Sequence, residues 1–185
     1  MLHMEQKDYK LEIINQLLKD NNHAREIAKK LNINHMIIVR KLKNLLDENV
    51  VDFKQQGKNK VYFLKNTIET KSYILKSENY KLIQLLKKYP SLRNIIEKIQ
   101  KNKKIKLAIL FGSYAKEIAK KESDIDIYIE TKDKELKKEI EKINTRLSIK
   151  IGEYDRTNFL IKEIKKNHII IKGIDKYYEK NNFFE

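Results

Sequence analysis

Apolar residues recur every three or four positions along the first fifty residues, which is the spacing of amphipathic helices. The pattern predicts a helix around residues 11–18, a second over residues 22–31 and a third over residues 34–48. The segment Asn32-Ile33-Asn34, between the last two, is typical of a short turn. Two helices joined by such a turn are typical of a helix-turn-helix motif.

A different pattern follows the third helix. Residues 50–53 and 60–64 are predicted as strands, and the polar residues 54–59 between them, with Gly57 at the turn, predict a β-hairpin. Residues 67–100 return to helical spacing around Pro90, the only proline. A proline ends one helix and is favoured in the first turn of the next, so Pro90 predicts a break between two helices.

The second half of the chain alternates short apolar runs with amphipathic segments. The runs predict strands at residues 105–111, 125–129, 147–152 and 168–171, and the segments predict helices over residues 133–146 and 157–166. This order predicts an α+β fold in which a small mixed sheet follows the helical first half.

The stretch from Phe111 to Asp126 carries the strongest chemical signal. Gly112 ends a predicted strand and lets the backbone approach a ligand closely, while Ser113 can cap the following helix and face an anion. Asp124 and Asp126 alternate along the next strand, so both carboxylates share a face about 7 Å apart. That spacing suits Mg²⁺ bound jointly with phosphates. The alternative is a surface helix leading to an edge strand that shows its acids to water.

This motif resembles the minimal nucleotidyltransferases of the DNA polymerase β superfamily, some of which act as antitoxins beside HEPN-domain toxins. The resemblance covers residues 101–185. It implies that Gly112 and Ser113 hold a nucleoside triphosphate, ATP or another NTP, and that Asp124 and Asp126 carry Mg²⁺ or Mn²⁺ and act in catalysis. A HEPN-type toxin is the candidate protein partner that it suggests.

A third carboxylate is the departure from that family pattern. Active members usually supply one from a later strand, yet residues 147–152 contain no acid. Glu153, or Asp155 just beyond, is the candidate to replace it. Lys116 is a candidate phosphate ligand in the helix after the turn, together with Lys120 and Lys121, and the alternative for each is a solvated helix face.

Residues 5–66 resemble a winged helix-turn-helix domain, which would lay its second helix of the motif in the DNA major groove and its hairpin along the backbone. The candidate DNA-binding residues are His35, Arg40, Lys41 and Lys43 on that helix and Lys54, Lys58 and Lys60 on the wing. Met36, Ile37 and Val39 are apolar where DNA readers often carry polar residues. A winged helix that docks a protein is therefore the alternative.

Composition agrees with these expectations without deciding between them. The 41 Lys+Arg against 26 Asp+Glu give a formal net charge of +15, which favours a polyanionic partner such as double-stranded DNA. The absence of cysteine excludes disulfides and thiolate metal sites. No apolar run approaches about 20 residues and the start lacks a signal-peptide core, so we expect a cytoplasmic protein without membrane contact.

The expected organisation is a winged helix-turn-helix over residues 1–66, a helical connector over residues 67–100 and a nucleotidyltransferase domain over residues 101–185. Two functions remain. In the first, the chain transfers a nucleotide from an NTP to a protein or small-molecule hydroxyl and uses DNA binding for targeting. In the second, it is a DNA-binding transcriptional regulator whose second domain senses nucleotide or docks a protein. A homodimer is a candidate assembly for either.

Overall fold

The computed structural model describes residues 7–184 and divides into two compact units between Ser77 and Glu78. The division falls inside the long helix α4 (Ile68–Lys88). Each unit has its own buried core. Among the described residues, no helix is both long and apolar enough to cross a membrane.

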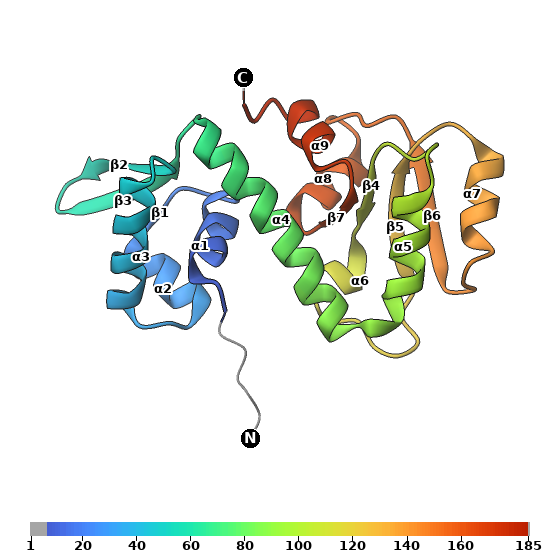
Figure 1. Ribbon diagram of the computed structural model, residues 1–185, viewed down its shortest axis with the longest axis horizontal. Helices are drawn as coiled ribbons and strands as arrows, with labels where there is room; N and C mark the ends of the chain where they lie inside the picture. Colours follow the sequence, from blue (N-terminus) through green and yellow to red (C-terminus); the bar gives the residue numbers. More distant parts are fainter. Residues whose placement is uncertain (1–6, 185) are drawn as a thin grey trace. The chain divides into compact units, whose positions relative to one another are not determined.

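The first unit is a three-helix body with a small antiparallel sheet (Figure 1). Its helices are α1 (Tyr9–Leu17), α2 (Ala24–Leu31) and α3 (His35–Asp47), and its strands are β1 (Asn22–His23), β2 (Val51–Gln56) and β3 (Asn59–Leu64), in the sheet order β1-β3-β2. Asn32 ends α2 in the left-handed conformation at φ 52°, and the Asn34 side chain accepts a hydrogen bond from the Met36 amide at the start of α3. The predicted helix-turn-helix is confirmed.

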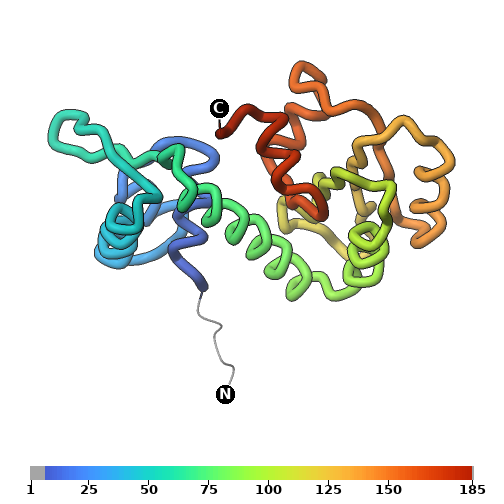
Figure 2. Tube along the Cα trace, turned by 45° about the horizontal axis from the view of Figure 1, so that its top comes forward, coloured from blue at the N-terminus to red at the C-terminus, as the bar shows by residue number. Residues whose placement is uncertain are grey.

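The β2–β3 hairpin is the wing of this unit. Val51 pairs with Leu64 and Gln56 with Asn59, so the turn consists of Gly57 and Lys58 alone. Gly57 has φ +57°, a conformation that favours glycine. Both views show the hairpin extending away from the three helices (Figures 1 and 2). The strands are longer and the turn tighter than the sequence predicted.

Pro90 separates two helices, as predicted. α4 ends at Lys88, and the 3₁₀ turn η1 (Pro90–Leu92) leads directly into α5 (Arg93–Lys101). The buried Leu92, Ile95, Ile96 and Ile99 then face the second unit's core.

The second unit contains a four-stranded mixed sheet with the order β6-β5-β4-β7. Its elements are β4 (Ala108–Leu110), α6 (Gly112–Ala115), β5 (Ile125–Glu130), α7 (Lys134–Glu141), β6 (Leu147–Gly152), α8 (Phe159–Lys166), β7 (Ile169–Lys172) and α9 (Ile174–Lys180). β4 is antiparallel to β5 and β7, while β5 and β6 are parallel and joined through α7. Figure 1 shows α7 beside β6 at one edge of the sheet and β7 at the other. The predicted α+β class with a small mixed sheet is confirmed.

Both faces of this sheet are covered. Ile125, Ile127 and Ile129 pack with buried residues of α5 and α7 on one face. On the other, Tyr128 is only 2 % exposed and its ring contacts Tyr154, which contacts Tyr177 of α9. The sequence predicted a core on the isoleucine face alone. The tyrosines of α9, Tyr177 and Tyr178, are both buried and therefore serve core packing.

The helix after Gly112 is much shorter than predicted. α6 has four residues and ends at Ala115, because Glu117 turns to φ +60° and the Ile118 amide donates back to the Ser113 carbonyl at 3.1 Å. Lys120 and Lys121 therefore lie in the loop before β5 and not on a helix.

A buried polar cluster ties α4, α8 and α9 together within the second unit. The Tyr178 hydroxyl donates to Glu78 Oε1 at 2.5 Å, and the Lys81 ammonium lies 2.7 Å from Glu78 Oε2. Nearby, His168 Nδ1 lies 3.0 Å from the Ile164 carbonyl. A carbonyl only accepts, so Nδ1 carries the proton, and His168 Nε2 is buried without a hydrogen-bond partner among the described residues.

Candidate nucleotide site and nucleic-acid interface

The turn after β4 and the start of β5 form one compact site. The Phe111 amide donates to the Asp126 carbonyl at 3.0 Å, and Gly112 follows with φ +69°. A Cβ atom at Gly112 would lie 2.3 Å from Asp126 Oδ2. Only glycine permits this approach, so the backbone at Gly112 lies directly against the Asp126 carboxylate.

Asp124 and Asp126 make this site acidic. Asp124 is exposed just before β5, whereas Asp126, two residues on, is half-buried. Burial raises the pKa of Asp126 above its usual value; the hydrogen bond to Ser148 opposes that rise and the charge of Asp124 adds to it. The ionised form of Asp126 is therefore disfavoured unless a cation lies beside it.

The neighbouring strand β6 brings no acid to this pair. The parallel register places Ser148 beside Asp126 and Lys150 beside Tyr128. Within residues 7–184, no three His, Asp or Glu side chains form a group that could hold a metal ion. Asp124 and Asp126 thus form a two-carboxylate site, with a hydroxyl and an ammonium on the adjacent strand.

Glu153 does not lie at this site. It follows Gly152, which pairs with Glu130, four residues along β5 from Asp126, or about 13 Å at strand spacing. The Glu153 carboxylate is 75 % exposed and pairs with Lys132 at 2.6 Å, and the hydrogen bond from Lys132 lowers its pKa. Asp155 lies further on and accepts from the Thr157 amide at 2.8 Å. The expectation that Glu153 supplies the third carboxylate is corrected, because the strand carries it to the opposite end of the sheet.

The other candidate nucleotide ligands lie close to the turn in the chain. Ser113 is half-buried in α6, and Lys116 is the exposed residue that caps the C-terminus of this helix. Lys88 of α4 donates to the Glu117 carbonyl at 2.8 Å and so anchors the start of the loop that follows Lys116.

Helix α3 presents a polar stripe to solvent. Ile38, Leu42 and Leu45 are fully buried, and the exposed residues at helical spacing on the other side are Met36, Arg40, Lys43, Asn44 and Asp47. Met36 keeps 69 % of its surface exposed, so it is not buried in the core of its unit. His35 and Lys41 are half-buried on either side of the stripe.

The wing carries three lysines that are open to solvent. Lys54, Lys58 and Lys60 are all exposed. The Lys60 ammonium lies 4.0 Å from the centroid of the Phe53 ring and that of Lys54 lies 5.6 Å from the Phe63 ring, so aromatic residues orient both.

Sequence reasoning missed Ser148 and Lys150 as neighbours of the aspartates. Their signal is the alternation of residues 147–152, which puts Ser148, Lys150 and Gly152 on one face. The register against β5 that brings Ser148 to Asp126 depends on α7 and its packing, and has no local marker.

Comparison with known proteins bears on the second unit. Residues 93–177 match the family model described as Polymerase beta, Nucleotidyltransferase. A comparison with curated proteins finds no match. One solved structure that matches is the transcriptional repressor BigR from Xylella fastidiosa, at 15 % identity and a TM-score of 0.34, over 37 % of this chain and 67 % of that chain. From α5 to α9, the chain is thus similar to a polymerase-beta nucleotidyltransferase domain.

Proposed function

We propose that the second unit binds a nucleoside triphosphate with a divalent cation and transfers the nucleotide to a hydroxyl, and that the winged helix directs this activity to DNA. The observation that carries the proposal is the contact between Gly112 and Asp126, since it joins a close backbone approach to a cation ligand. The family match over residues 93–177 supports the reaction class. The proposed acceptor is a protein or small-molecule hydroxyl, with a HEPN-domain toxin as the candidate protein.

The residues present fit one divalent cation shared with phosphate oxygens. Asp124 and Asp126 supply two hard oxygen ligands, and the raised pKa of Asp126, which burial causes, is what a nearby cation would reverse. Such an ion would neutralise phosphate charge during transfer. The protein's part is to hold the triphosphate against Gly112 and Ser113, with Lys116 as a further cationic ligand.

A second function is favoured by one observation, namely that Ser148 and Lys150 occupy the adjacent strand where a further acid would complete a larger cation site. In that case the unit binds nucleotide without transferring it, and the chain is a DNA-binding regulator that senses nucleotide.

Nucleotide transfer is tested with α-labelled ATP, Mg²⁺ and candidate acceptors. Wild-type protein is expected to label an acceptor, Asp124→Asn to lose the labelling, and Glu153→Gln to retain the wild-type rate, because Glu153 lies at the far end of β6 and pairs with Lys132. Labelled acceptor on a denaturing gel is the readout. Nucleotide-dependent stabilisation without any labelling would favour the sensor.

For the first unit we propose binding of double-stranded DNA, with α3 in the major groove and the β2–β3 wing along the phosphates. The exposed stripe around Arg40 and Lys43 supports the first contact, and the exposed wing lysines support the second. Met36 lies on the same stripe, where an apolar side chain can contact a thymine methyl.

The salt dependence of DNA affinity tests this assignment. Lys58→Ala with Lys60→Ala is expected to flatten the log–log salt slope by up to about 1.8, since each lost phosphate contact removes about 0.9. Arg40→Ala is expected to cost about 1–3 kcal/mol on the preferred sequence and less on others. Fluorescence anisotropy at several salt concentrations measures both.

The matched control is Lys134→Ala with Lys142→Ala, which removes two exposed lysines from the second unit. Should the control flatten the slope as much as the wing variant does, net charge alone accounts for binding and the winged helix becomes a protein-docking module.

A further inference from the structure

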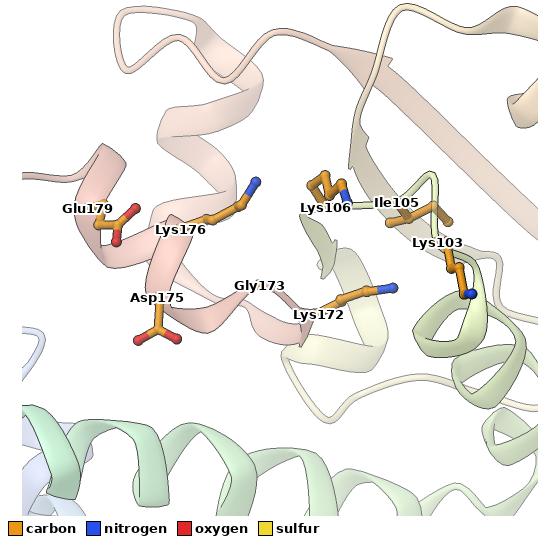
Figure 3. A pocket seen from close by; sticks show the side chains of 8 residues that line it. All are labelled: Lys103, Ile105, Lys106, Lys172, Gly173, Asp175, Lys176 and Glu179. Atoms are coloured by element: carbon orange, nitrogen blue, oxygen red, sulfur yellow. The ribbon is translucent and has the colours of Figure 1, made fainter.

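A cavity lies in the nucleotidyltransferase-like unit, away from the aspartates. It has a volume of about 610 Å³ and is lined by Lys103, Ile105, Lys106, Lys172, Gly173, Asp175, Lys176 and Glu179 (Figure 3). Lys172 pairs with Ala108 at the start of β4, whereas Gly112 follows the end of β4. The cavity and the Gly112–Asp126 site are therefore at opposite ends of this strand.

Four lysines from two separate segments surround this cavity. Lys103 and Lys106 precede β4, while Lys172 and Lys176 come from the end of β7 and from α9. Figure 3 shows Lys106 and Lys176 on opposite sides of the cavity, with the Lys176 side chain extending toward the Lys106 side and Asp175 pointing away from both. Four lysines and two acids, Asp175 and Glu179, thus line the cavity, so its lining carries more positive than negative charge.

Three of these ammonium groups form no ion pair within residues 7–184. Lys172 donates to the carbonyls of Gln100 at 2.7 Å and Asn102 at 2.8 Å, so its role is to close the end of α5. In the described part of the chain, none of Lys103, Lys106 and Lys176 is within ion-pair distance of an acid, whereas other lysines there, such as Lys81 and Lys132, are paired. Like charges converging in a concave site favour a multivalent anion.

The backbone that carries these lysines is fixed. Gly173 has φ +82°, and a Cβ atom there would lie 2.3 Å from the Lys106 carbonyl. The turn between β7 and α9 therefore packs directly against the backbone of Lys106, just before β4. This contact holds the two sides of the cavity at a set separation, which reduces the cost of ordering a ligand between them.

We propose that this cavity binds an oligophosphate group, either free or as the diphosphate or triphosphate of a nucleotide, through Lys103, Lys106 and Lys176. The phosphate oxygens accept from the three ammonium groups, and the volume is within the range of small-ligand sites, about 300–1,000 Å³. Binding needs no divalent cation, because lysines supply the counter-charge. This site does not depend on the proposed transfer activity.

Calorimetric titration of the full chain in EDTA tests the proposal, with Asp126→Asn present in every sample so that the Gly112–Asp126 site cannot contribute. Tripolyphosphate is expected to bind, and Lys106→Gln with Lys176→Gln is expected to weaken it about tenfold or more, since hydrogen bonds to charged groups are lost. Lys134→Gln with Lys142→Gln, which removes the same charge from exposed positions of another surface, is expected to leave the affinity unchanged.

ATP and tripolyphosphate distinguish the source of the ligand. Tighter binding of ATP assigns the cavity to a nucleotide, and tighter binding of tripolyphosphate assigns it to free oligophosphate. Absence of binding by both, or an equal loss in the two lysine variants, would overturn the proposal. Circular dichroism of each variant verifies that the lysine changes leave the fold intact.

Discussion

Asp126→Asn is expected to abolish the stabilisation that ATP and Mg²⁺ together give the wild-type protein. A ligand at one hundred times its Kd stabilises the native state by about 2.7 kcal/mol, and the variant is expected to lose this whole effect because it lacks the carboxylate beside Gly112 that we propose as the cation ligand. Melting temperatures with ATP alone, Mg²⁺ alone and both together measure the loss.

The same variant is expected to melt at a higher temperature than wild type without ligand. Burial raises the pKa of Asp126 in the folded state, so its contribution to stability is present below the unfolded pKa and is lost as pH rises through the folded one. At neutral pH the ionised carboxylate therefore costs stability, and asparagine removes that cost. Glu139→Gln, at an exposed position of α7, is the control. It should leave the melting temperature unchanged both without ligand and with ATP and Mg²⁺. An undiminished ATP effect in Asp126→Asn would exclude this carboxylate as a ligand.

Acidification is expected to destabilise the second unit through His168. Burial lowers the pKa of His168 to about 4, and the charge of Lys81 adds to this shift. Below pH 6.5 the unfolded chain binds a proton at this residue that the native state excludes, so the free energy of unfolding falls as pH falls from about 6.5 to about 4. The loss is on the order of 3 kcal/mol by the low end of that range.

Urea unfolding at several pH values between 7 and 4 separates this effect from the titration of carboxylates. His168→Gln keeps a donor for the Ile164 carbonyl but cannot take up the proton. Between about pH 6.5 and 4, the slope of its unfolding free energy against pH should therefore be smaller than that of wild type by the contribution of one proton. Tyr177→Phe removes only the hydroxyl 3.4 Å from His168 Nδ1 and should keep the wild-type dependence. Identical pH profiles for His168→Gln and wild type would show that the native and unfolded states bind the His168 proton equally, which would contradict a lowered pKa in the native state.

Much of the fold could be predicted because its signals are local. The turn at Asn32, the break at Pro90 and the glycine at the hairpin each follow from the conformation of one residue. The approach of Gly112 to Asp126 was also within reach, since a buried strand, a glycine turn and an acidic strand were all visible in sequence order.

What could not be predicted depends on contacts between distant segments. The short α6 ends just before Glu117, whose carbonyl accepts a hydrogen bond from Lys88 of α4. No residue near Ala115 predicts that end from the sequence. The placement of Ser148 beside Asp126, and of Glu153 away from it, is set by the register of two parallel strands. The lysine cavity likewise could not be predicted from the sequence, because Lys106 and Lys176 line the same cavity only after β4 and β7 have paired.

The pairing of β4 with β7 has a consequence for the order in which the chain folds during synthesis. The first unit is complete once the chain has emerged to Ser77. The second sheet waits for Ile169 to reach Leu110, and until then β4 offers an open apolar edge. A ribosome therefore releases a finished first unit well before the second can close, and the interval between them is when the chain is most exposed to aggregation.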